Sequence, residues 1–448
     1  MKKITLILAV LFTICWFPMT AQKAMDLASE CLSQKSDFKQ GILIPEEGPV
    51  ELQLRNNGIV DELLLKNPEG FDLKNWITFN HSFKNEDTLV LKNDKIEERF
   101  CLKFQYSKPK SRGAALPEKG YVKFPVFFAT DRNYNRGKEI EETFGTRRGD
   151  LHYGLCEVSI PNTHTPGEIE EPSLWKLEFE EDPKEHIMIH SAKLLSKDSF
   201  IKRLNSEIAD SDKSASFLFI HGYNVSFSEA AKRTAQISYD LLFDGVPVFY
   251  SWPSKASLSG YTNDEANISW AQANIKTFLE DYLTKSTADE IYLIAHSMGN
   301  RGLTGALLEL LKEQPHLKTR IKEVILAAPD IDADVFKRDI APKMAELTQN
   351  PVTLYVSEDD VALKASKLAH GYPRAGDVSD GLVLIEGIET VDASGIDTSF
   401  LGHSYFAESH SIISDIFDLI KTGRRAEKRK ILKKILETNP DYWKVKTE

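Results

Sequence analysis

The stretch Ile291-Tyr292-Leu293-Ile294-Ala295-His296-Ser297-Met298-Gly299-Asn300 decides the fold of this chain. Its first four residues are apolar and predict a buried strand, and a helix-compatible stretch from Leu303 to Leu311 follows at once. Between them, Ser297 stands between the small residues Ala295 and Gly299. This order is typical of a nucleophile elbow, in which a tight turn lifts a serine hydroxyl above the end of a parallel sheet.

The small residues beside Ser297 have a steric reason. The backbone of such a turn is strained, and a larger side chain at position 295 or 299 would collide with a neighbouring strand or helix. Short patterns of this kind also occur by chance, because a serine near a glycine is often a turn residue or a helix N-cap. The order of the surrounding segments must therefore decide whether Ser297 is a nucleophile.

Strands and helices alternate along the part of the chain that contains Ser297. Apolar runs predict strands, and apolar residues at roughly helical intervals predict the helices between them. This alternation implies an α/β fold with a mostly parallel, doubly wound sheet. The expected strands are Val122 to Thr130, Leu151 to Pro161, Phe217 to Ile220, Val246 to Ser251, Ile291 to Ile294, Val324 to Ala328 and Val352 to Val356, and the expected helices include Ser228 to Leu242 and Glu265 to Leu283.

The N-terminal end predicts export and a separate lobe. Residues 1–21 carry two lysines, a short apolar run and the small residues Thr20 and Ala21, which is the pattern of a secretory signal peptide. We therefore expect a periplasmic or secreted protein. Residues 22–106 contain short apolar or alternating runs between turn clusters and predict a small β-rich lobe. Residues 107–120 are rich in Lys, Pro, Ser and Gly and predict a linker.

The predicted α/β domain spans residues 121–420, and residues 421–448 form a basic end. Apolar residues among the lysines and arginines predict a C-terminal helix or tail that could touch an acidic membrane, although a solvated helix face is the alternative. The net charge of −11 does not suggest a nucleic-acid partner. Cys31 and Cys101 could form a disulfide or remain buried thiols, and no cysteine spacing indicates a zinc site.

A serine hydroxyl is a poor nucleophile at neutral pH, so it needs a base and a carboxylate that orients the base. In an α/β-hydrolase arrangement both follow the serine along the chain, on loops after later strands. Asp360 is the predicted acid, because it follows the strand Val352 to Val356. Asp359 and Asp330 are alternative acids. For Asp330, capping of the helix that begins near Ala333 is the other interpretation.

His403 is the predicted base. It lies in a glycine-flanked loop before the amphipathic helix Ile412 to Ile420, which is where the required order places a triad histidine. His370 follows Asp360 too soon, and His410 lies too near the helix, so both are weaker candidates.

Two backbone amides are expected to form an oxyanion hole. Met298 supplies the N–H after the nucleophile, and Tyr223 supplies the N–H from the loop after an earlier strand. Gly222 allows close approach of this loop. His221 is expected to orient the loop rather than to act as an acid or base.

Three residues on nearby loops are candidates for lining a substrate pocket: His221, Trp252 and Tyr261. Trp252 follows a strand, and packing beneath a turn is its alternative role. Asp131-Arg132, at the end of the first expected strand of the domain, is interpreted as a structural ion pair or a loop anchor.

Together these parts predict a serine hydrolase that cleaves a carboxylic ester through an acyl-enzyme. The mechanism needs no metal or organic cofactor, and the expected partner is a small-molecule or lipid-like ester. The same triad would also serve an amidase or an acyltransferase. An envelope-associated binding protein built on a hydrolase domain is a further alternative, favoured by the N-terminal lobe and the basic end. The oligomeric state is not predicted.

These motifs also resemble those of the bacterial α/β-hydrolases of unknown function called the DUF900 family. The resemblance covers roughly residues 122–420 and implies the α/β-hydrolase fold, an esterase-like activity, and triad positions at Ser297, Asp360 and His403. It does not extend to residues 22–106. The matching motifs are Val126 to Arg132, His221 to Phe227, Tyr250 to Ser254, Ala295 to Asn300, Ala328 to Asp332, Leu354 to Ser357 and Gly402 to Tyr405.

Overall fold

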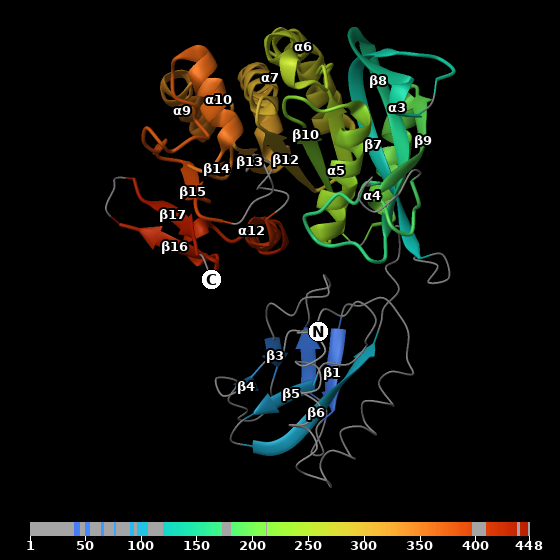
Figure 1. The fold of residues 1–448 in the computed structure, drawn as a ribbon, viewed down its shortest axis with the longest axis vertical. Coiled ribbons are helices and arrows are strands. Elements are labelled where there is room, and N and C mark those ends of the chain that lie inside the picture. The colour runs from blue at the N-terminus through green and yellow to red at the C-terminus, as the bar shows by residue number, and fades with distance from the viewer. Residues whose placement is uncertain are drawn as a thin grey trace, which may run out of the picture. The chain divides into compact units, whose positions relative to one another are not determined.

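The computed structural model describes residues 120–138, 140–172, 181–211, 213–396, 409–436 and 440–446, together with the backbone of six strands nearer the N-terminus. The chain divides into two compact units, Met1–Pro109 and Lys110–Glu448 (Figure 1). Their boundary falls within residues 107–120, where a linker is expected. The expected signal peptide lies outside the described residues, and so do the side chains of Cys31 and Cys101, for which the sequence left a disulfide and buried thiols open.

The first unit contains an antiparallel sheet, drawn in blue in Figure 1. Its strand order is β3-β2-β1-β6-β5-β4. The predicted β-rich N-terminal lobe is thus confirmed. The strands are β1 (Gln40–Ile44), β2 (Val50–Gln53), β3 (Leu64–Lys66), β4 (Trp76–Ile77), β5 (Val90–Asn93) and β6 (Ile96–Gln105).

The second unit is built on an eleven-stranded sheet with the order β16-β17-β15-β14-β13-β12-β10-β11-β7-β8-β9. Neighbours from β17 to β7 pair in parallel, and the two edges, β16-β17 and β7-β8-β9, are antiparallel. The predicted mostly parallel sheet is confirmed. The strands are β7 (Tyr121–Tyr134), β8 (Phe144–Pro161), β9 (Met188–Leu195), β10 (Ala215–Ile220), β11 (Val246–Ser251), β12 (Glu290–His296), β13 (Ile321–Ala327), β14 (Val352–Val356), β15 (Ile388–Asp392), β16 (Leu432–Ile435) and β17 (Tyr442–Val445).

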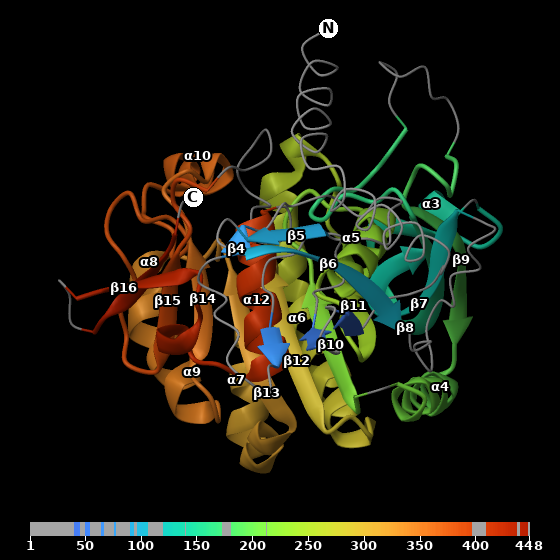
Figure 2. The same cartoon turned by 90° about the horizontal axis from the view of Figure 1, so that it is seen from below.

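Helices cover both faces of this sheet, because successive side chains of its central strands point to opposite faces. Leu218 and Ile220 of β10 join a core with α4, α6, α7 and α9, whereas Phe217 and Phe219 join a core with α5 and α12. Figure 1 shows α6 and α7 on one side of the sheet and α12 on the other, and Figure 2 shows α5 and α12 from their own side. The helices are α3 (Ile140–Thr143), α4 (Lys197–Ala209), α5 (Phe227–Asp240), α6 (Tyr261–Lys285), α7 (Gly299–Glu313), α8 (Ala333–Val335), α9 (Ala341–Leu347), α10 (Val361–His370) and α12 (His410–Thr422).

The basic C-terminal segment is a short turn and two strands, so the predicted C-terminal helix is wrong. β17 pairs with β15 in parallel, and the sheet therefore continues beyond residue 420. Two arginines of this segment form ion pairs with acidic residues of the domain. The Arg429 guanidinium is fully buried and lies 2.8 Å from the Asp415 carboxylate, and Arg425 lies 2.8 Å from Glu323. Buried pairs of this kind fix the chain locally, which a solvated amphipathic helix would not do. Of the helices in the described ranges, none has the length and apolarity needed to cross a membrane.

Besides β17, one further strand of the parallel part of the sheet was not predicted. The apolar run from Leu382 to Ile385 looks like a strand, but it lies in a loop, and β15 follows it at Ile388–Asp392. β15 contains Glu389 and Asp392, which weaken its apolar pattern. Both carboxylates pair with basic residues from the C-terminal segment: Arg425 and Arg429 for Glu389, and Lys444 for Asp392.

Candidate active site

Ser297 lies between β12 and α7, in a backbone conformation that non-glycine residues rarely adopt. Its φ angle is +53°, in the left-handed region. The turn is held by the next strand, because the Ser297 N–H donates to the Ala327 carbonyl oxygen at 3.0 Å. The buried Asn300 side-chain amide donates to the carbonyl oxygens of Ser297 (2.9 Å) and Ala327 (3.0 Å). The described strand, turn and helix have the geometry of a nucleophile elbow.

The loop after β10 lies directly against this elbow. A Cβ atom added to Gly222 would lie 2.8 Å from the Ser297 Cβ, closer than side chains tolerate. A Cβ atom added to Gly299 would lie 2.4 Å from the His221 carbonyl oxygen and 2.6 Å from that of Ile220. The expected steric reason for a small residue at position 299 is therefore confirmed, and its collision partner is backbone at the end of β10.

The two amides expected to form an oxyanion hole flank this contact. The Tyr223 hydroxyl donates to the Ser257 (3.1 Å) and Leu258 carbonyl oxygens, which ties the loop to the segment before α6. Among the hydrogen bonds of the described residues, none uses the backbone N–H of Tyr223 or of Met298. Both donors are thus available to a ligand placed beside Ser297.

Arg132, at the end of β7, anchors the loop that carries Tyr223. Its guanidinium is fully buried and donates to the carbonyl oxygens of Val225 (2.7 Å) and Ser254 (3.0 Å) and to the Ser251 hydroxyl (2.8 Å). Burial lowers the pKa of Arg132 to about 10, against the opposing effect of Asp131, so the side chain stays charged at neutral pH. These hydrogen bonds of Arg132 confirm the loop-anchor interpretation. The neighbouring Asp131 carboxylate accepts a hydrogen bond from the Asn274 side chain at 3.1 Å.

His221 and Trp252 are buried supports of the same loop. Their rings stack with centroids 5.1 Å apart, and the Trp252 Nε1–H donates to the His221 carbonyl oxygen at 2.8 Å. The His221 Nδ1–H donates to the Gly222 carbonyl oxygen at 2.8 Å. Burial and the Arg132 charge hold the pKa of His221 well below its usual range, so the ring is neutral. Both residues thus orient and support the loop, and their role in lining a pocket stays a prediction.

Asp330 sits in a network of hydrogen bonds and charges that joins α6, α7 and α10. Its carboxylate accepts from the Tyr261 hydroxyl (2.5 Å) and the Ser366 hydroxyl (2.6 Å), and lies 3.2 Å from Arg301 and 3.3 Å from Arg374. Burial acts to raise its pKa, but the Arg301 charge and these hydrogen bonds keep the pKa below its usual range. The Tyr261 hydroxyl is engaged in this network, and the role of Tyr261 in lining a pocket stays a prediction.

Two further predictions concern this region: Asp330 as a helix cap, and His370 as a weaker candidate for the base. Asp330 does not cap the helix after it, because the Asp332 carboxylate accepts from the amides of Asp334 and Val335, both at 3.0 Å. The capping interpretation for Asp330 is therefore wrong. His370 is also engaged, with its Nδ1 2.7 Å from the Ser366 carbonyl oxygen and its Nε2 2.8 Å from the Glu265 carboxylate.

The two other carboxylates lie in the loop after β14. Asp360 is fully buried at the start of α10, and its Oδ1 accepts from the Leu363 N–H at 2.9 Å. Asp359 is exposed, and its Oδ2 accepts from the Gly395 N–H at 2.6 Å. His403 and the side chain of His410 lie outside the described residues. In the described part of the chain, no group of three or more His, Cys, Asp and Glu side chains is arranged to hold a metal ion.

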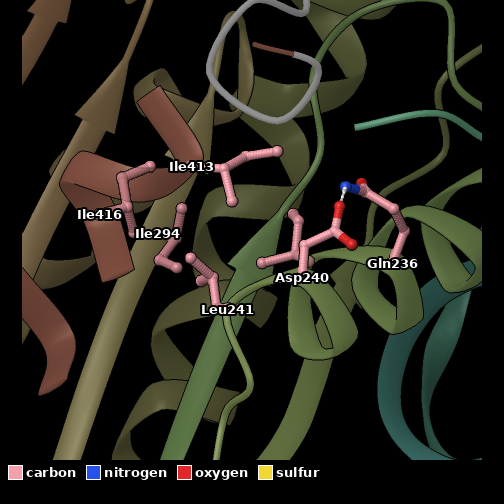
Figure 3. Close-up of a pocket in the computed structure, with 7 residues that line it drawn as sticks. Gln236, Asp240, Leu241, Ile294, Ile413 and Ile416 are labelled. Atoms are coloured by element: carbon pink, nitrogen blue, oxygen red, sulfur yellow. Dashed lines mark hydrogen bonds between the residues drawn. The ribbon is translucent and has the colours of Figure 1, made fainter. Parts of the chain in front are cut away.

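A small pocket lies on the other face of the sheet, among α5, β12 and α12 (Figure 3). Asp240 at its edge accepts a hydrogen bond from Gln236, and the opposite wall is formed by isoleucines of β12 and α12. None of the predicted site residues lines it, so it is separate from the elbow. The lining residues are Gln236, Ile237, Asp240, Leu241, Ile294, Ile413 and Ile416.

Sequence reasoning assigned no role to Asn300 or Arg301. Both directly follow the elbow motif, and this position is the only sequence signal that could have drawn attention to them. Their partners, Ala327 and Asp330, come from the next strand and its loop, so their roles became visible only once the sheet was assembled.

The sequence profile of a family described as "Alpha/beta hydrolase of unknown function (DUF900)" matches residues 196–422, just over half of the 448-residue chain. The chain belongs to this family. The match covers β10 to α12, and so includes the elbow, the loop after β10 and the loops after β13 and β14. A comparison with curated proteins returns no similar sequence.

Several solved structures of lipases and esterases are distantly similar to this family member. Lipase B of Aspergillus fumigatus is 11% identical with a TM-score of 0.28; the likeness covers 47% of this chain and 53% of that one, about half the lipase's length. The carboxylesterase CesB of Bacillus subtilis is 12% identical, with a TM-score of 0.26 and coverage of 48% and 85%. A Trichoderma reesei cutinase, solved with a phosphonate inhibitor, is 14% identical, with a TM-score of 0.25 and coverage of 46% and 82%. Likenesses at this level carry no argument about activity.

Proposed function

We propose that this protein is a serine hydrolase that cleaves carboxylic esters through an acyl-enzyme intermediate. Ser297 is the nucleophile, His403 the general base and Asp360 the carboxylate that orients the histidine. The backbone amides of Tyr223 and Met298 stabilise the oxyanion. The substrate is a small-molecule or lipid-like ester.

The observation that carries this proposal is the positive φ angle of Ser297 at the end of a central parallel strand. Such a conformation costs about 1–3 kcal/mol and persists only where the surroundings enforce it, often at functional sites. The neighbouring amides of Tyr223 and Met298, without an acceptor in the described chain, add the donors that an oxyanion requires.

Asp360 is a better acid than its two alternatives. Asp330 already has four partners, so orienting a histidine would require breaking a buried network. Asp359 is exposed, where water weakens its interaction with a histidine. Asp360 is fully buried after the strand where the triad order expects an acid, and its Oδ1 accepts from the Leu363 N–H at the start of α10.

The steps follow from these roles. The Ser297 Oγ attacks the ester carbonyl carbon while its proton passes to the histidine, and the carbonyl oxygen becomes an oxyanion between the two amides. Collapse of this intermediate breaks the ester bond, and the histidine returns the proton to the leaving alcohol. Water then attacks the acyl-enzyme by the same route and releases the acid.

Ester hydrolysis by three matched variants tests these assignments. Ser297→Ala should lower kcat by at least about 10³-fold, and Asp360→Asn by about 10²- to 10⁴-fold, with both proteins still folded. Asp330→Asn should instead act on stability, by about 3–5 kcal/mol in denaturant unfolding, because it leaves Arg301 and Arg374 without their shared partner. Full hydrolysis by a folded Ser297→Ala protein would overturn the proposal. Activity loss confined to Asp330→Asn would reassign the acid.

A further inference from the structure

Arg374 is held rigidly beside the loop that follows β13. Its backbone forms an isolated antiparallel bridge with Asp332. The next two residues are also fixed, since the Ala375 N–H donates to the Ile331 carbonyl oxygen (2.8 Å) and the Gly376 N–H to that of Pro329 (3.0 Å). A Cβ atom at Gly376 would lie 2.6 Å from the carbonyl carbon of Ala328. The segment therefore has no room to shift, and the arginine is presented from a fixed backbone.

The guanidinium of Arg374 is buried, but its outer edge has no partner. The residue is 3% exposed. Its Nε donates to the Ser366 hydroxyl at 2.8 Å and lies 3.3 Å from an Asp330 oxygen. The Nη2 atom is shielded from solvent without any hydrogen bond, and no hydrogen bond of the described residues uses Nη1.

Arg301 shows what a purely structural arginine looks like in the same network. Its Nε donates to the Asp330 carbonyl oxygen, its Nη1 to Glu265, and its Nη2 to both Tyr261 and the Asp330 carboxylate. Every nitrogen of Arg301 is used, whereas the terminal nitrogens of Arg374 are not. A buried donor without an acceptor costs about 1–3 kcal/mol, so such a donor in a fold needs an explanation.

The terminal nitrogens of Arg374, which have no hydrogen-bond partner, suit a carboxylate ligand. Two terminal nitrogens of a guanidinium form a planar fork that matches the two oxygens of a carboxylate. Among the ion pairs of the described residues, Arg374 pairs with Asp330, and Arg301 shares that carboxylate. Asp377, three residues further along, directs its Oδ1 to the Ser379 hydroxyl (2.5 Å) and makes no ion pair with Arg374 among the described contacts.

This site adjoins the elbow. The Asp330 N–H donates to the Ser297 carbonyl oxygen at 3.3 Å, so Arg374 is two contacts from the nucleophile. On the other side, Tyr261 packs edge-on against Tyr223 with ring centroids 5.2 Å apart. The cluster therefore contacts both the elbow and the loop that carries the Tyr223 amide.

We propose that Arg374 binds a carboxylate group carried by the ester substrate and thereby sets the substrate preference. This inference rests on the proposed ester hydrolysis. The carboxylate accepts from Nη1, while Asp330 and Ser366 hold the Nε side in place and Nη2 stays shielded from solvent. The favoured substrates are half-esters of dicarboxylic acids, in which one carboxyl is esterified and the other is free.

The test compares two esters with the same leaving group and similar acyl length: the p-nitrophenyl half-ester of glutaric acid and neutral p-nitrophenyl valerate. Wild type should prefer the anionic ester in kcat/KM. Arg374→Gln should lower kcat/KM for that ester by at least about 10-fold, mainly through KM, and change the neutral ester by less than about 3-fold. Lys367→Gln removes one nearby positive charge that is paired with Asp380, and should keep the wild-type ratio. An equal fall for both esters, or an unchanged ratio, would overturn the proposal.

Calorimetric titration separates this inference from the proposed function, because binding does not require turnover. Glutarate should bind Ser297→Ala protein, and adding Arg374→Gln should weaken that binding by at least about 10-fold. Arg374-dependent binding without hydrolysis of any ester would leave the subsite standing and remove the proposed function. Hydrolysis without Arg374-dependent binding would leave the proposed function standing and overturn the carboxylate subsite. If Arg374→Gln does not fold, Arg374→Lys keeps the charge without the fork and should retain only part of the preference; a wild-type preference in that variant would overturn the assignment.

Discussion

At Ser297, the backbone takes a conformation that a non-glycine residue holds only when its neighbours enforce it. The neighbours can be named: the Ala327 carbonyl oxygen accepts the Ser297 N–H, and the Asn300 amide fixes the carbonyl oxygens of both residues. Gly222 then allows the loop after β10 to touch the elbow. The position of the serine hydroxyl thus depends on three segments that are distant in sequence.

Replacing Gly222 by alanine tests this dependence. The new Cβ atom would lie 2.8 Å from the Ser297 Cβ and 3.1 Å from the His296 Nδ1, so the loop and the elbow must move apart. Because a shift of about 1 Å near the reacting groups can cost about 10²-fold in rate, kcat/KM for a neutral ester should fall by about 10- to 100-fold.

Gly305→Ala is the matched control. Its Cβ atom would meet only the end of the Gln272 side chain, which can move aside, and alanine favours the helix. This variant should keep wild-type kinetics. Wild-type kinetics in Gly222→Ala would show that the close contact does not position the nucleophile.

Several residues of the candidate site could be predicted from the sequence, and the roles that were missed were missed for physical reasons. The small residues around Ser297 reveal the elbow because close approach excludes larger side chains. By contrast, burial cannot be read from residue type, so the sequence alone did not establish that Trp252 and His221 are buried and stack on each other. Asp330 looked like a helix cap because its four partners come from α6, α7, α10 and the segment after α10.

Among the elements, the segment after β8 is attached to α5 by a buried histidine. The His164 Nδ1 lies 2.8 Å from Glu170 and its Nε2 lies 2.9 Å from Asp240 of α5. Burial acts to lower the pKa of His164, but hydrogen bonds and charge from Asp240 and Glu170 raise it to about 9. The ring is therefore protonated at neutral pH and joins the two carboxylates.

This raised pKa predicts how stability depends on pH. The stabilisation by His164 is fully present below its unfolded-state pKa of about 6.5 and is lost as the pH rises to about 9, because the folded state then loses the proton it held. The unfolding free energy should fall by up to about 3 kcal/mol over this window. Denaturant unfolding at a series of pH values measures it.

His164→Gln supplies the comparison. The variant should be less stable than wild type at pH 6 and should lack most of the decrease between pH 6.5 and 9. Parallel curves for the two proteins would show that the pKa of His164 is not raised by folding.

β15 and the C-terminal segment were mispredicted for one shared reason. Both carry charged residues that would be costly alone but compensate each other, as in the pairs of Glu389 with Arg425 and Arg429. Patterns of apolar residues cannot reveal such pairing, because each partner looks like an exposed residue in its own segment. Strands with plain apolar runs, such as β10 and β12, were predicted correctly.

For the whole molecule, the division at Pro109 separates the β-rich lobe from the complete eleven-stranded sheet. We expect a chain of residues 110–448 to fold alone and to hydrolyse neutral esters within about 3-fold of the full chain, because every described site residue lies in this unit. Thermal unfolding and ester kinetics would check this. Aggregation would show that residues 110–448 do not fold alone. Loss of activity in a folded fragment would show that hydrolysis requires the lobe.

The proposed order of Ser297, Asp360 and His403 belongs to this scale, because strand–helix alternation defines which loops meet at the edge of a parallel sheet. The substrate was not readable, since a triad fixes the reaction type and leaves the acyl group to the pocket. The proposed substrate class rests on the unpartnered terminal nitrogens of Arg374, and these depend on side-chain packing that a sequence does not display.

The central claim is that Ser297 is the nucleophile, and reaction with a fluorophosphonate probe tests it most directly. The account predicts one covalent adduct per wild-type chain by intact mass, located on the peptide that contains Ser297, and no adduct on folded Ser297→Ala protein. A folded wild-type protein that stays unlabelled, or an adduct at another residue, would contradict it.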